Sequence, residues 1–424
     1  MTGQDKAPGH VVVVGAGQAG VQLVDSLRAG GYRGRLTLLS RESERPYQRP
    51  PLSKDFVVGG RDAEPLRLRG ESFFEDVGVG ARWGVSAVAI DRSGQRVRTS
   101  AGDWMTYDAL VLATGADSRG LGIPGEHLAG VHRLRTLDDA RDASGGLESA
   151  RQVVVVGAGF IGLEFAAGAR ARGLDVTVVS PTARPLRRSV TPAVSAYLTE
   201  RQELDGVRFE LSEGVAALSG GDDDAGRVAA VVLTSGRTLP ADLVVVGVGV
   251  TPASALAAEA GVAIEGDGGI AVDGSLRTSD SAIFAIGDCA SFPSLHAGRR
   301  MRLESVQNAT DHARHAAAVL LGQDPGPYAE LPWFWSHQGK VKLQIAGLSR
   351  PGVSTVLRGD PASGKFSVFA FDDGELVSVE SVNSPADHLA ARRLLAAGAA
   401  LSPDEAADLA FDLKAYSRAA PVPA

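Results

Sequence analysis

Residues 153–164, VVVVGAGFIGLE, decide how this chain folds, because they place a glycine turn directly after a run of four valines. The same VVVVGAG stands at residues 11–17 and continues as Gln18-Ala19-Gly20. Both copies read G-x-G-x-x-G between an apolar run and a helical pattern. In this order the glycines allow a tight turn, and the helix N-terminus offers free N–H groups to a pyrophosphate. The sequence therefore predicts two dinucleotide-binding units in one chain.

Further apolar runs indicate the rest of the sheets. They are short and rich in Val, Ile and Leu, which is typical of parallel strands covered on both faces. Helical patterns at residues 18–29 and 160–172 follow two of them, and this alternation predicts an α/β, doubly wound fold. The Gly- and Asp-rich residues 216–226 are predicted to form a loop or hairpin tip. The predicted strands are residues 10–14, 36–39, 109–113, 152–156, 176–179, 243–246 and 282–285.

The C-terminal part of the chain has a different pattern. Residues 366–383, FSVFAFDDGELVSVESVN, read as two strands joined at Asp373-Gly374, which is a hairpin signal. Ser384-Pro385 then begins a helix that we expect to reach about residue 400, with Ser as N-cap and Pro at the first helical position. Ser402-Pro403 repeats this start signal. The pattern predicts an α+β domain distinct from the first two.

Composition limits the class of protein. A chain of 424 residues is too long for one ordinary core, and 44% hydrophobic with 22% charged residues is typical of a soluble globular protein. A net charge of −7 argues against nucleic-acid binding. The single cysteine, Cys289, excludes an internal disulfide and a CxxC pair. The N-terminus lacks a signal pattern and no apolar run approaches the roughly 20 residues of a membrane span, so we expect a cytoplasmic protein.

Two dinucleotide cradles predict two dinucleotides, unless one copy is an idle duplicate. FAD and NAD(P)H form the natural pair, because hydride passes between flavin and nicotinamide. Three segments at strand ends support this reading: residues 45–54 (RPYQRPPLSK), 111–119 (VLATGADSR) and 244–252 (VVVGVGVTP). A fourth, residues 283–290 (IFAIGDCA), places Asp288 where its carboxylate can accept hydrogen bonds from sugar hydroxyls. The order and spacing of the four segments strengthen the prediction.

No metal site is predicted. His312 and His315 stand three apart on a predicted helix, but no acidic or Cys partners accompany them. A metal centre built from protein ligands needs such partners. The chemistry is therefore expected to reside in the organic cofactors.

These segments resemble the FAD-dependent NAD(P)H ferredoxin reductases of bacterial oxygenase and cytochrome P450 systems, with apoptosis-inducing factor as a more distant relative. The resemblance covers nearly the whole chain and includes RPPLSK, ATG, GAGFIGLE, GDCA, LESVQNA and PWFWSHQGKVKLQIAG. The last two segments distinguish this family from the disulfide reductases. The resemblance implies three domains: a split FAD domain over residues 1–119 and 246–325, an NAD(P)H domain over 120–245, and a C-terminal α+β domain over 326–424.

The resemblance also implies which residues contact the cofactors. Lys54 and Glu164 would form a catalytic pair where nicotinamide stacks on flavin. Glu304 would lie near the nicotinamide, and Val306 and Trp335 near the isoalloxazine. The complete set assigned to cofactor binding is Gly15, Ala16, Gly17, Gln18, Ala19, Gly20, Arg41, Glu42, Arg49, Lys54, Ala87, Ala113, Thr114, Gly115, Arg119, Gly157, Gly159, Phe160, Ile161, Gly162, Glu164, Ser180, Arg188, Gly249, Asp288, Glu304, Val306 and Trp335.

The chain departs from the family pattern at three places. In the first cradle, Arg41 stands where relatives often have an acid, although Glu42 follows it. In the second cradle, Ser180 replaces the glutamate that selects NADH, and Arg184, Arg187 and Arg188 follow. Loss of the carboxylate removes repulsion toward a 2′-phosphate, so dual or NADPH-leaning use is one hypothesis, although relatives with the glutamate also have arginine here. His337 replaces the aspartate of the usual WSDQ segment.

The sequence thus predicts a flavoprotein oxidoreductase that passes electrons from NAD(P)H through FAD to a small iron–sulfur protein. The expected partner is a transiently bound [2Fe–2S] ferredoxin that feeds an oxygenase or cytochrome P450. Two alternatives remain open. One is a reductase of another acceptor, such as rubredoxin, a quinone or monodehydroascorbate. The other is a slow-turnover, nucleotide-dependent binding protein. The oligomeric state is not predicted.

Overall fold

The computed structural model describes residues 7–54, 56, 59, 64–221 and 226–420. The chain divides into two compact units that each draw on separate stretches of sequence. Unit 1 comprises Met1–Gln48, Ala63–Asp117 and Thr251–Pro332. Unit 2 comprises Arg49–Asp62, Ser118–Val250 and Trp333–Ala424. Each unit contains one copy of VVVVGAG.

The core of unit 1 is a parallel five-stranded sheet with the strand order β19-β7-β1-β2-β3. Its central strand is the first valine run, whose residues Val11, Val12 and Val13 are fully buried. Burial on both faces explains why the sequence shows no polar alternation here. The strands are β1 (His10–Val14), β2 (Arg35–Leu39), β3 (Gly80–Arg82), β7 (Ala109–Leu112) and β19 (Ile283–Ala285).

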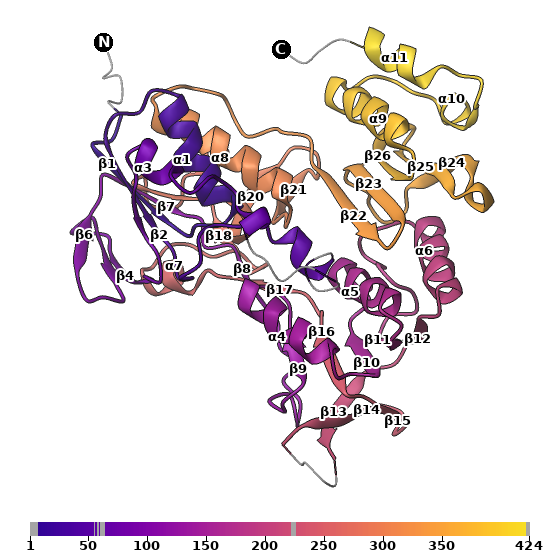
Figure 1. Ribbon diagram of the computed structural model, residues 1–424. Helices are drawn as coiled ribbons and strands as arrows, with labels where there is room; N and C mark the ends of the chain where they lie inside the picture. Colours follow the sequence, from indigo (N-terminus) through magenta and orange to yellow (C-terminus); the bar gives the residue numbers. More distant parts are fainter. Residues whose placement is uncertain (1–6, 55, 57–58, 60–63, 222–225, 421–424) are drawn as a thin grey trace. The chain divides into compact units, whose positions relative to one another are not determined.

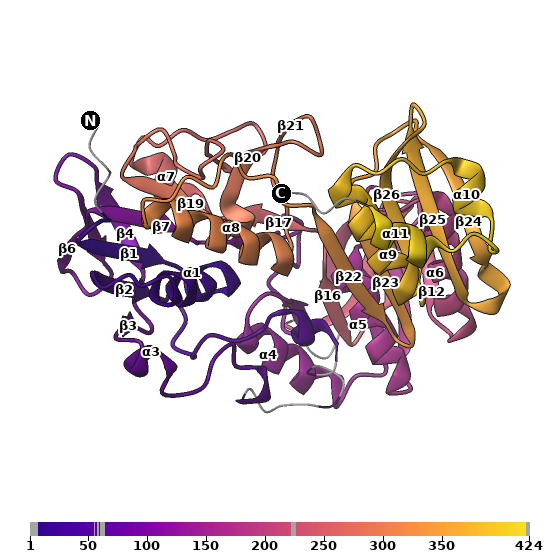
Figure 2. The same cartoon turned by 90° about the horizontal axis from the view of Figure 1, so that it is seen from above.

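Two long helices of unit 1, α1 (Gln18–Ala29) and α8 (Val306–Leu320), lie side by side in both views (Figures 1 and 2). Helix α1 buries Val21, Val24 and Leu27, whose spacing places them on one face of a helix. Four of the eight residues that helix α8 buries are alanines, which allow close helix packing. Shorter helices are α3 (Phe73–Asp76), α7 (Ala255–Glu259), η2 (Glu64–Leu66) and η3 (Gly287–Cys289).

Unit 1 also contains two small antiparallel or mixed sheets. One is the meander β4 (Ala87–Asp91), β5 (Arg96–Thr99) and β6 (Trp104–Thr106). The other consists of β18 (Ile270–Ala271), β20 (Ala290–Ser294) and β21 (Arg299–Met301). Two further short strands, β8 (Ala116–Ser118) and β17 (Val250–Pro252), lie where the chain passes between the units.

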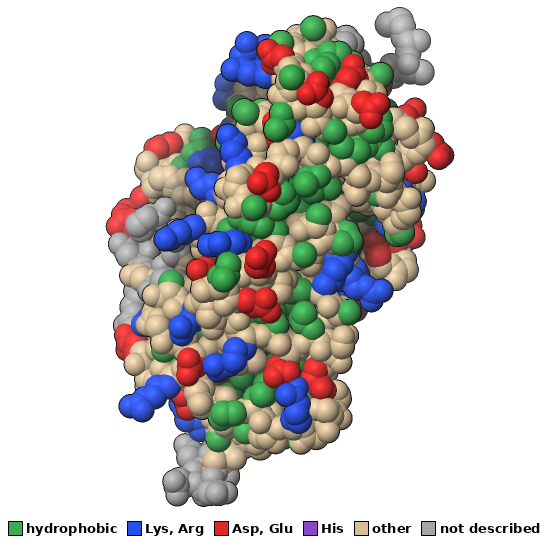
Figure 3. Space-filling model, turned by 90° about the vertical axis from the view of Figure 1, so that its right-hand side faces the viewer, with side chains coloured by type: hydrophobic (Ala, Val, Ile, Leu, Met, Phe, Trp, Pro, Cys, Tyr) green, Lys and Arg blue, Asp and Glu red, His purple; other side chains and the backbone are tan. Residues whose placement is uncertain are grey.

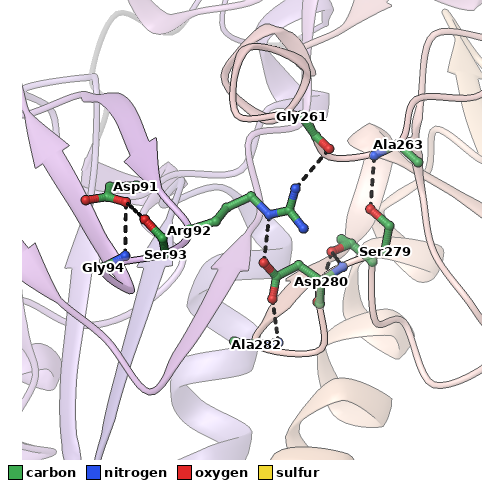
Figure 4. Close-up of polar contacts among 10 residues, drawn as sticks. Asp91, Arg92, Ser93, Gly94, Gly261, Ala263, Ser279, Asp280 and Ala282 are labelled. Carbon is green, nitrogen blue, oxygen red and sulfur yellow. Dashed lines mark hydrogen bonds and ion pairs between the residues drawn. The ribbon is translucent and has the colours of Figure 1, made fainter.

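Arg92 joins the β4–β6 meander to the segment that precedes β19 through hydrogen bonds (Figure 4). Arg92 follows β4, and its Nε donates to Asp280 Oδ2 over 2.7 Å while its Nη1 donates to Gly261 O over 3.1 Å. The other oxygen of Asp280 accepts from the backbone N–H of Ala282 over 3.1 Å. Both side chains are partly buried, so this pair is less exposed to solvent screening than a surface ion pair.

Unit 2 contains a second parallel sheet with the order β12-β11-β10-β16-β9. Its central strand is the second valine run. The strands are β9 (Val131–Arg133), β10 (Gln152–Val156), β11 (Asp175–Ser180), β12 (Arg208–Leu211) and β16 (Leu243–Val246). The helices of this part are α4 (Leu137–Leu147), α5 (Phe160–Ala171) and α6 (Pro192–Leu204), and η1 (Pro50–Ser53) also belongs to unit 2. A small antiparallel sheet consists of β13 (Val215–Gly220), β14 (Val228–Leu233) and β15 (Thr238–Pro240).

The C-terminal part of unit 2 is an antiparallel sheet with the order β22-β23-β26-β25-β24, and helix α9 packs on strands β23 and β26 (Figure 1). The strands are β22 (Trp333–Gln338), β23 (Val341–Gly347), β24 (Ser354–Asp360), β25 (Lys365–Asp372) and β26 (Glu375–Val382). The helices are η4 (Pro361–Ser363), α9 (Pro385–Ala397), α10 (Pro403–Ala407) and α11 (Leu413–Ala419).

The predicted fold class is confirmed: two parallel, doubly wound sheets and a C-terminal α+β part are present. The predicted hairpin at Asp373-Gly374 joins β25 to β26. The helix expected to reach about residue 400 ends at Ala397, because Gly398 adopts a left-handed conformation with φ of 57°. The three domain boundaries stay a prediction, since unit 2 combines the second parallel sheet, the C-terminal sheet and Arg49–Asp62.

One segment differs from its prediction. The Gly- and Asp-rich residues 216–226 were expected to form a loop or hairpin tip, but β13 continues to Gly220. Leu218 is buried in the hydrophobic core under this sheet, and this burial extends the strand into a polar sequence. The hairpin itself is present, because β13 pairs antiparallel with β14. Residues 222–225 lie outside the described residues.

The surface shows a mixture of charges. On the face in Figure 3, acidic and basic side chains are interspersed between small hydrophobic patches. Within the described part of the chain, no helix is both long enough and apolar enough to cross a membrane.

Candidate functional site

The glycine turn of unit 1 has two glycines that the protein itself requires. Gly15 has a φ of 109°, and a Cβ added to it would lie 2.2 Å from the carbonyl oxygen of Ala113. A Cβ added to Gly20 would lie 1.9 Å from the carbonyl oxygen of Gly15. Gly17 is different. It has an ordinary φ of −77°, and an added Cβ would meet no atom of the described residues within 4 Å.

The glycine turn of unit 2 repeats this arrangement. Gly157 has a φ of 111°, and an added Cβ would lie 2.4 Å from the carbonyl oxygen of Gly247. A Cβ on Gly162 would lie 2.2 Å from the carbonyl oxygen of Gly157. A Cβ on Gly159 would meet only the oxygen of Gly247, at 3.9 Å. In both turns the middle glycine is much less crowded than the other two, which leaves the room that a pyrophosphate needs to approach the backbone.

The helices that follow the two turns have free N-termini. In the described part of the chain, neither α1 nor α5 has a side-chain hydrogen bond at its N-cap or an acidic residue in its first turn. The positive end of each helix is therefore available to an anion. Ile161, in the first turn of α5, has 38% of its surface exposed. The residues present fit two dinucleotides.

The GDC turn of unit 1 packs against the beginning of α1. Gly287 has a φ of 74°, and an added Cβ would lie 3.1 Å from Cβ of Ala19. The Gly287 N–H donates to Nδ1 of His312 over 3.2 Å, and Arg302 donates to the Asp288 carbonyl over 2.7 Å. These contacts hold Asp288 in the same unit as the first glycine turn, as its predicted role requires. The other histidine nitrogen is buried without a partner among the described residues.

The segment that follows β7 is fixed by Ala253. Thr114 Oγ1 donates to the Ala253 carbonyl over 2.7 Å, and the Ala253 N–H donates to the Gly115 carbonyl over 3.0 Å. The carbonyl oxygen of Ala113, the residue before Thr114, lies against Gly15 of the first glycine turn. These contacts place Ala113, Thr114 and Gly115 at the end of the central sheet of unit 1. Ala87, another predicted residue of this unit, is half-buried at the start of β4.

The end of β2 has an acid, one residue later than in the usual pattern. Tyr47 donates its hydroxyl hydrogen to the carboxylate of Glu42. Arg41 is exposed and forms an ion pair of 2.7 Å with Asp117. Tyr47 therefore orients the Glu42 carboxylate, whereas the Arg41 guanidinium is paired with Asp117.

Three other predicted residues of unit 1 lie on or beside the two long helices. Gln18 donates to Thr310 Oγ1 over 3.1 Å and so connects α1 to α8. Val306 is the first residue of α8. Glu304 is exposed and pairs with Arg302 over 2.8 Å.

Glu164 is the centre of a buried polar cluster in unit 2. Its Oε1 accepts from Ser336 Oγ over 2.6 Å and lies 3.2 Å from Lys54 Nζ. Its Oε2 accepts from Ser53 Oγ over 2.6 Å. The side chains of Glu164 and Lys54 are 6% and 14% exposed. The structure thus brings together the predicted Lys54–Glu164 pair and adds two serines to it.

An aromatic cluster lies next to this polar cluster. The rings of Phe160 and Phe334 have centroids 4.6 Å apart, so strand β22 lies against the start of α5. Trp335 is partly exposed and its ring centroid is 5.5 Å from that of Trp333. His337, which replaces the family's aspartate, is exposed on the same strand.

Ser180 ends strand β11 and is only 4% exposed. Its Oγ lies 3.0 Å from Thr182 Oγ1. Arg188 is exposed in the following loop. The structure thus provides no carboxylate at the position where NADH-specific folds have one.

The remaining predicted residues of unit 2 lie in two loops. Arg49 donates to the carbonyl of Arg135 over 2.5 Å. The Arg119 N–H donates to the carbonyl of Gly249 over 2.9 Å. Gly249 is exposed with a φ of 102°, a conformation that favours glycine.

Sequence reasoning missed another buried carboxylate, Glu380 on β26. Thr191, the N-cap of α6, donates its N–H to both Glu380 oxygens over 2.9 and 3.0 Å and its hydroxyl to one of them over 2.6 Å. Burial raises the pKa of Glu380 to about 7, against the opposing effect of these hydrogen bonds and of Arg184. The carboxylate therefore connects the C-terminal sheet to the loop after β11.

Sequence reasoning also missed Ser53 and Ser336, and it considered His312 only as a metal ligand. Ser53 and Ser336 stand inside segments that were quoted for other residues, RPPLSK and PWFWSHQ. A serine between aromatic or apolar neighbours on a buried element is a signal for a buried hydrogen-bond partner. His312 gave no such signal, because its role depends on a turn 25 residues away.

Comparisons with known proteins agree with this architecture. Residues 9–313 match the family model described as pyridine nucleotide-disulphide oxidoreductase, and residues 333–417 match the one described as reductase C-terminal. The chain belongs to the pyridine nucleotide-disulphide oxidoreductase family. It combines that fold with a reductase C-terminal domain, as the resemblance implied.

Several named proteins are similar to this chain over nearly its whole length. Rhodocoxin reductase of Rhodococcus erythropolis is 46% identical over 404 residues, which cover 95% of this chain and 93% of the relative. The ferredoxin reductase for the CYP199A2 system from Rhodopseudomonas palustris superposes with a TM-score of 0.93 at 46% identity, covering 96% of this chain and 100% of that one. The covalent putidaredoxin reductase–putidaredoxin complex matches with a TM-score of 0.93 at 35% identity, covering 98% and 99%.

Proposed function

We propose that this protein is an FAD-dependent NAD(P)H reductase that passes electrons to a [2Fe–2S] ferredoxin in the cytoplasm. The observation that carries this proposal is the doubled glycine turn, in which, among the described residues, a Cβ on Gly17 would meet no atom within 4 Å and one on Gly159 only a carbonyl oxygen at 3.9 Å. Two cradles of this kind in one chain match a flavin and a nicotinamide dinucleotide. Bound FAD supplies the chemistry, since it accepts two electrons as a hydride and releases them singly.

We assign the first cradle to FAD. Backbone N–H groups at the start of α1 would bind the pyrophosphate, and Glu42 and Asp288 would accept hydrogen bonds from sugar hydroxyls. Tyr47 orients Glu42, and the Gly287–His312 hydrogen bond orients the turn that contains Asp288. The second cradle, at the start of α5, would hold NAD(P)H in the same way.

The Lys54–Glu164 pair is assigned to positioning the nicotinamide. Glu164 is held from both sides by Ser53 and Ser336, and this fixes its carboxylate. The carboxylate in turn holds the Lys54 ammonium 3.2 Å away. Two opposite charges in a nearly water-free place give a strong local field, because the surrounding dielectric screens them poorly. Alignment of the reacting groups is the contribution that hydride transfer needs from the protein.

The experiment that tests this proposal is anaerobic stopped-flow reduction of the purified flavoprotein by NADH and by NADPH. Rapid bleaching of the flavin by either nucleotide, followed by reduction of an added [2Fe–2S] ferredoxin, is the expected result. Rubredoxin and a quinone serve as comparison acceptors in the second step. Absence of bleaching by both nucleotides, with FAD bound, would contradict the proposal. Fast flavin reduction with transfer only to rubredoxin or the quinone would identify another acceptor.

A further inference from the structure

The end of strand β11 lacks the acidic residue that binds the ribose 2′-hydroxyl in NAD-binding folds. This difference bears on which nicotinamide dinucleotide the second cradle binds. In dinucleotide folds, an Asp or Glu at this point binds the 2′-hydroxyl of the adenosine ribose and excludes a 2′-phosphate. Here Ser180 occupies the position, and its Oγ lies 3.0 Å from Thr182 Oγ1. Thr182 Oγ1 in turn donates to the carbonyl of Arg184 over 2.9 Å. The strand end thus carries two hydroxyl groups, which are bonded within the loop, and no negative charge.

The loop after β11 is basic throughout. Residues 176–199 contain three arginines and no Asp or Glu. The loop returns to the glycine turn, because the Leu186 N–H donates to the carbonyl of Ala158 over 3.0 Å. Leu186 has a φ of 52°, a left-handed conformation that reverses the chain at this contact. Arg187 and Arg188 directly follow the residue that is bonded to the nucleotide cradle.

Two of the three arginines are available to a ligand. Arg184 is occupied, since its guanidinium donates to the carbonyls of Val190 and Arg187 over 3.1 and 3.0 Å. Arg187 and Arg188 are exposed, and neither forms an ion pair with a residue that the structure describes. Arginine binds phosphate oxygens through paired hydrogen bonds.

Nearby acids do not neutralise the loop. Glu210 on β12 pairs with Arg237 over 2.5 Å. Glu213, whose N–H donates to the Ser180 carbonyl, accepts from Thr234 and from the Ser235 N–H. These carboxylates already have partners, so they compete little for the free arginines.

We propose that residues 180–188 bind the 2′-phosphate of NADPH, which makes NADPH the preferred hydride donor. The proposal rests on the proposed function, because it assigns the second cradle to a nicotinamide dinucleotide. Ser180 brings no negative charge that would repel the phosphate, and Arg187 and Arg188 supply positive charge. A phosphate monoester has a charge of about −1.5 to −2 at neutral pH, so two free arginines match it.

Equilibrium binding tests the subsite without catalysis. Isothermal titration of the holoprotein with 2′,5′-ADP and with 5′-AMP compares ligands that differ only in the 2′-phosphate. We expect 2′,5′-ADP to bind at least about tenfold more tightly at low salt, and its affinity to fall more steeply as salt is added. Equal affinities for the two ligands would overturn the proposal.

Variants locate the effect. The double variant Arg187→Ala/Arg188→Ala should lose about tenfold or more of the affinity for 2′,5′-ADP while its affinity for 5′-AMP stays unchanged. Arg201→Ala removes an exposed arginine of α6 in the same part of unit 2, and serves as the matched control with no change expected. Ser180→Glu should reverse the preference. A double variant that still prefers 2′,5′-ADP as strongly as the wild type would overturn the assignment.

Flavin reduction separates this proposal from the proposed function. Stopped-flow reduction should give a kcat/KM for NADPH about tenfold or more above that for NADH. If NADH reduces the flavin as well as NADPH and 5′-AMP binds as tightly as 2′,5′-ADP, the reductase assignment stands and the 2′-phosphate subsite is wrong. If neither nucleotide reduces the flavin, the proposed function fails, and the titrations alone decide the subsite.

Discussion

Ser336 donates a hydrogen bond of 2.6 Å to Glu164, although 172 positions separate the two residues in the chain. The bond joins the first strand of the C-terminal sheet to the helix that follows the second glycine turn. Ser53, from the PPLSK segment, donates to the other carboxylate oxygen. Three distant segments of unit 2 therefore meet at one carboxylate, and Lys54 provides its counter-charge.

Glu164→Gln should slow flavin reduction by NAD(P)H by about tenfold or more, because the Lys54 ammonium loses the charge that fixes it. Stopped-flow measurement at saturating nucleotide checks this. Ser336→Ala is the matched control for stability. It keeps both charges and removes one hydrogen bond to a carboxylate, so it should lower the free energy of unfolding by about 1.5–3 kcal/mol. Unchanged reduction rates in the Gln variant would remove Glu164 from the proposed positioning role.

Gly17→Ala should retain the fold but bind FAD poorly. Within the part of the chain that the structure describes, its added methyl group meets no atom within 4 Å, so the free energy of unfolding should change by less than about 1 kcal/mol. Gly20→Ala places a methyl group 1.9 Å from a carbonyl oxygen and should cost about 3 kcal/mol or more. The flavin content after purification and chemical denaturation of each variant distinguish the two effects. A Gly17 variant that keeps full flavin occupancy would speak against the first cradle as the FAD site.

His312→Gln should flatten the acid side of the stability profile. Burial, with a smaller contribution from His315, lowers the pKa of His312 from 6.5 to about 3. A depressed pKa means that the native state resists protonation, so stability is complete above pH 6.5 and is lost as the pH falls toward 3. Between pH 6.5 and 4.5 the wild type should lose roughly 2–3 kcal/mol more than the variant. Urea denaturation across this range provides the test, and parallel profiles would contradict it.

Glu380→Gln should have the opposite pH dependence. The raised pKa of Glu380 means that the native state holds the proton more tightly than the unfolded chain, whose glutamate titrates near 4.5. Wild-type stability therefore falls as the pH rises from about 4.5 to about 7. The Gln variant lacks this fall. Between pH 4.5 and 7 its free energy of unfolding should therefore rise, relative to that of the wild type, by about 1.4 kcal/mol for each unit by which the pKa is raised. Denaturation at pH 5 and pH 8 compares the two proteins. A constant difference between them would show that Glu380 does not titrate in this range.

The sequence by itself determined the local architecture. Each VVVVGAG run predicted a buried parallel strand, a glycine turn and a helix, because these signals depend on neighbouring residues only. The same holds for the Asp373-Gly374 hairpin and for the helix start at Ser402-Pro403, which the structure reproduces with Ser402 as the N-cap of α10. The boundary of β13 was wrong by several residues, because burial of Leu218 is decided by packing rather than by local composition.

Only the tertiary structure decided which side chains share a buried polar site. The pairing of Lys54 with Glu164 followed from the family resemblance, but the serines that fix it did not. Thr191 and Glu380 are 189 positions apart, and Ser53 and Glu164 are 111 apart. Such contacts depend on how whole elements pack, and no short stretch of sequence encodes that geometry. A buried carboxylate needs hydrogen-bond donors, and tertiary packing decides which donors reach it. Here Glu164 accepts hydrogen bonds from two serine hydroxyls and pairs with the Lys54 ammonium.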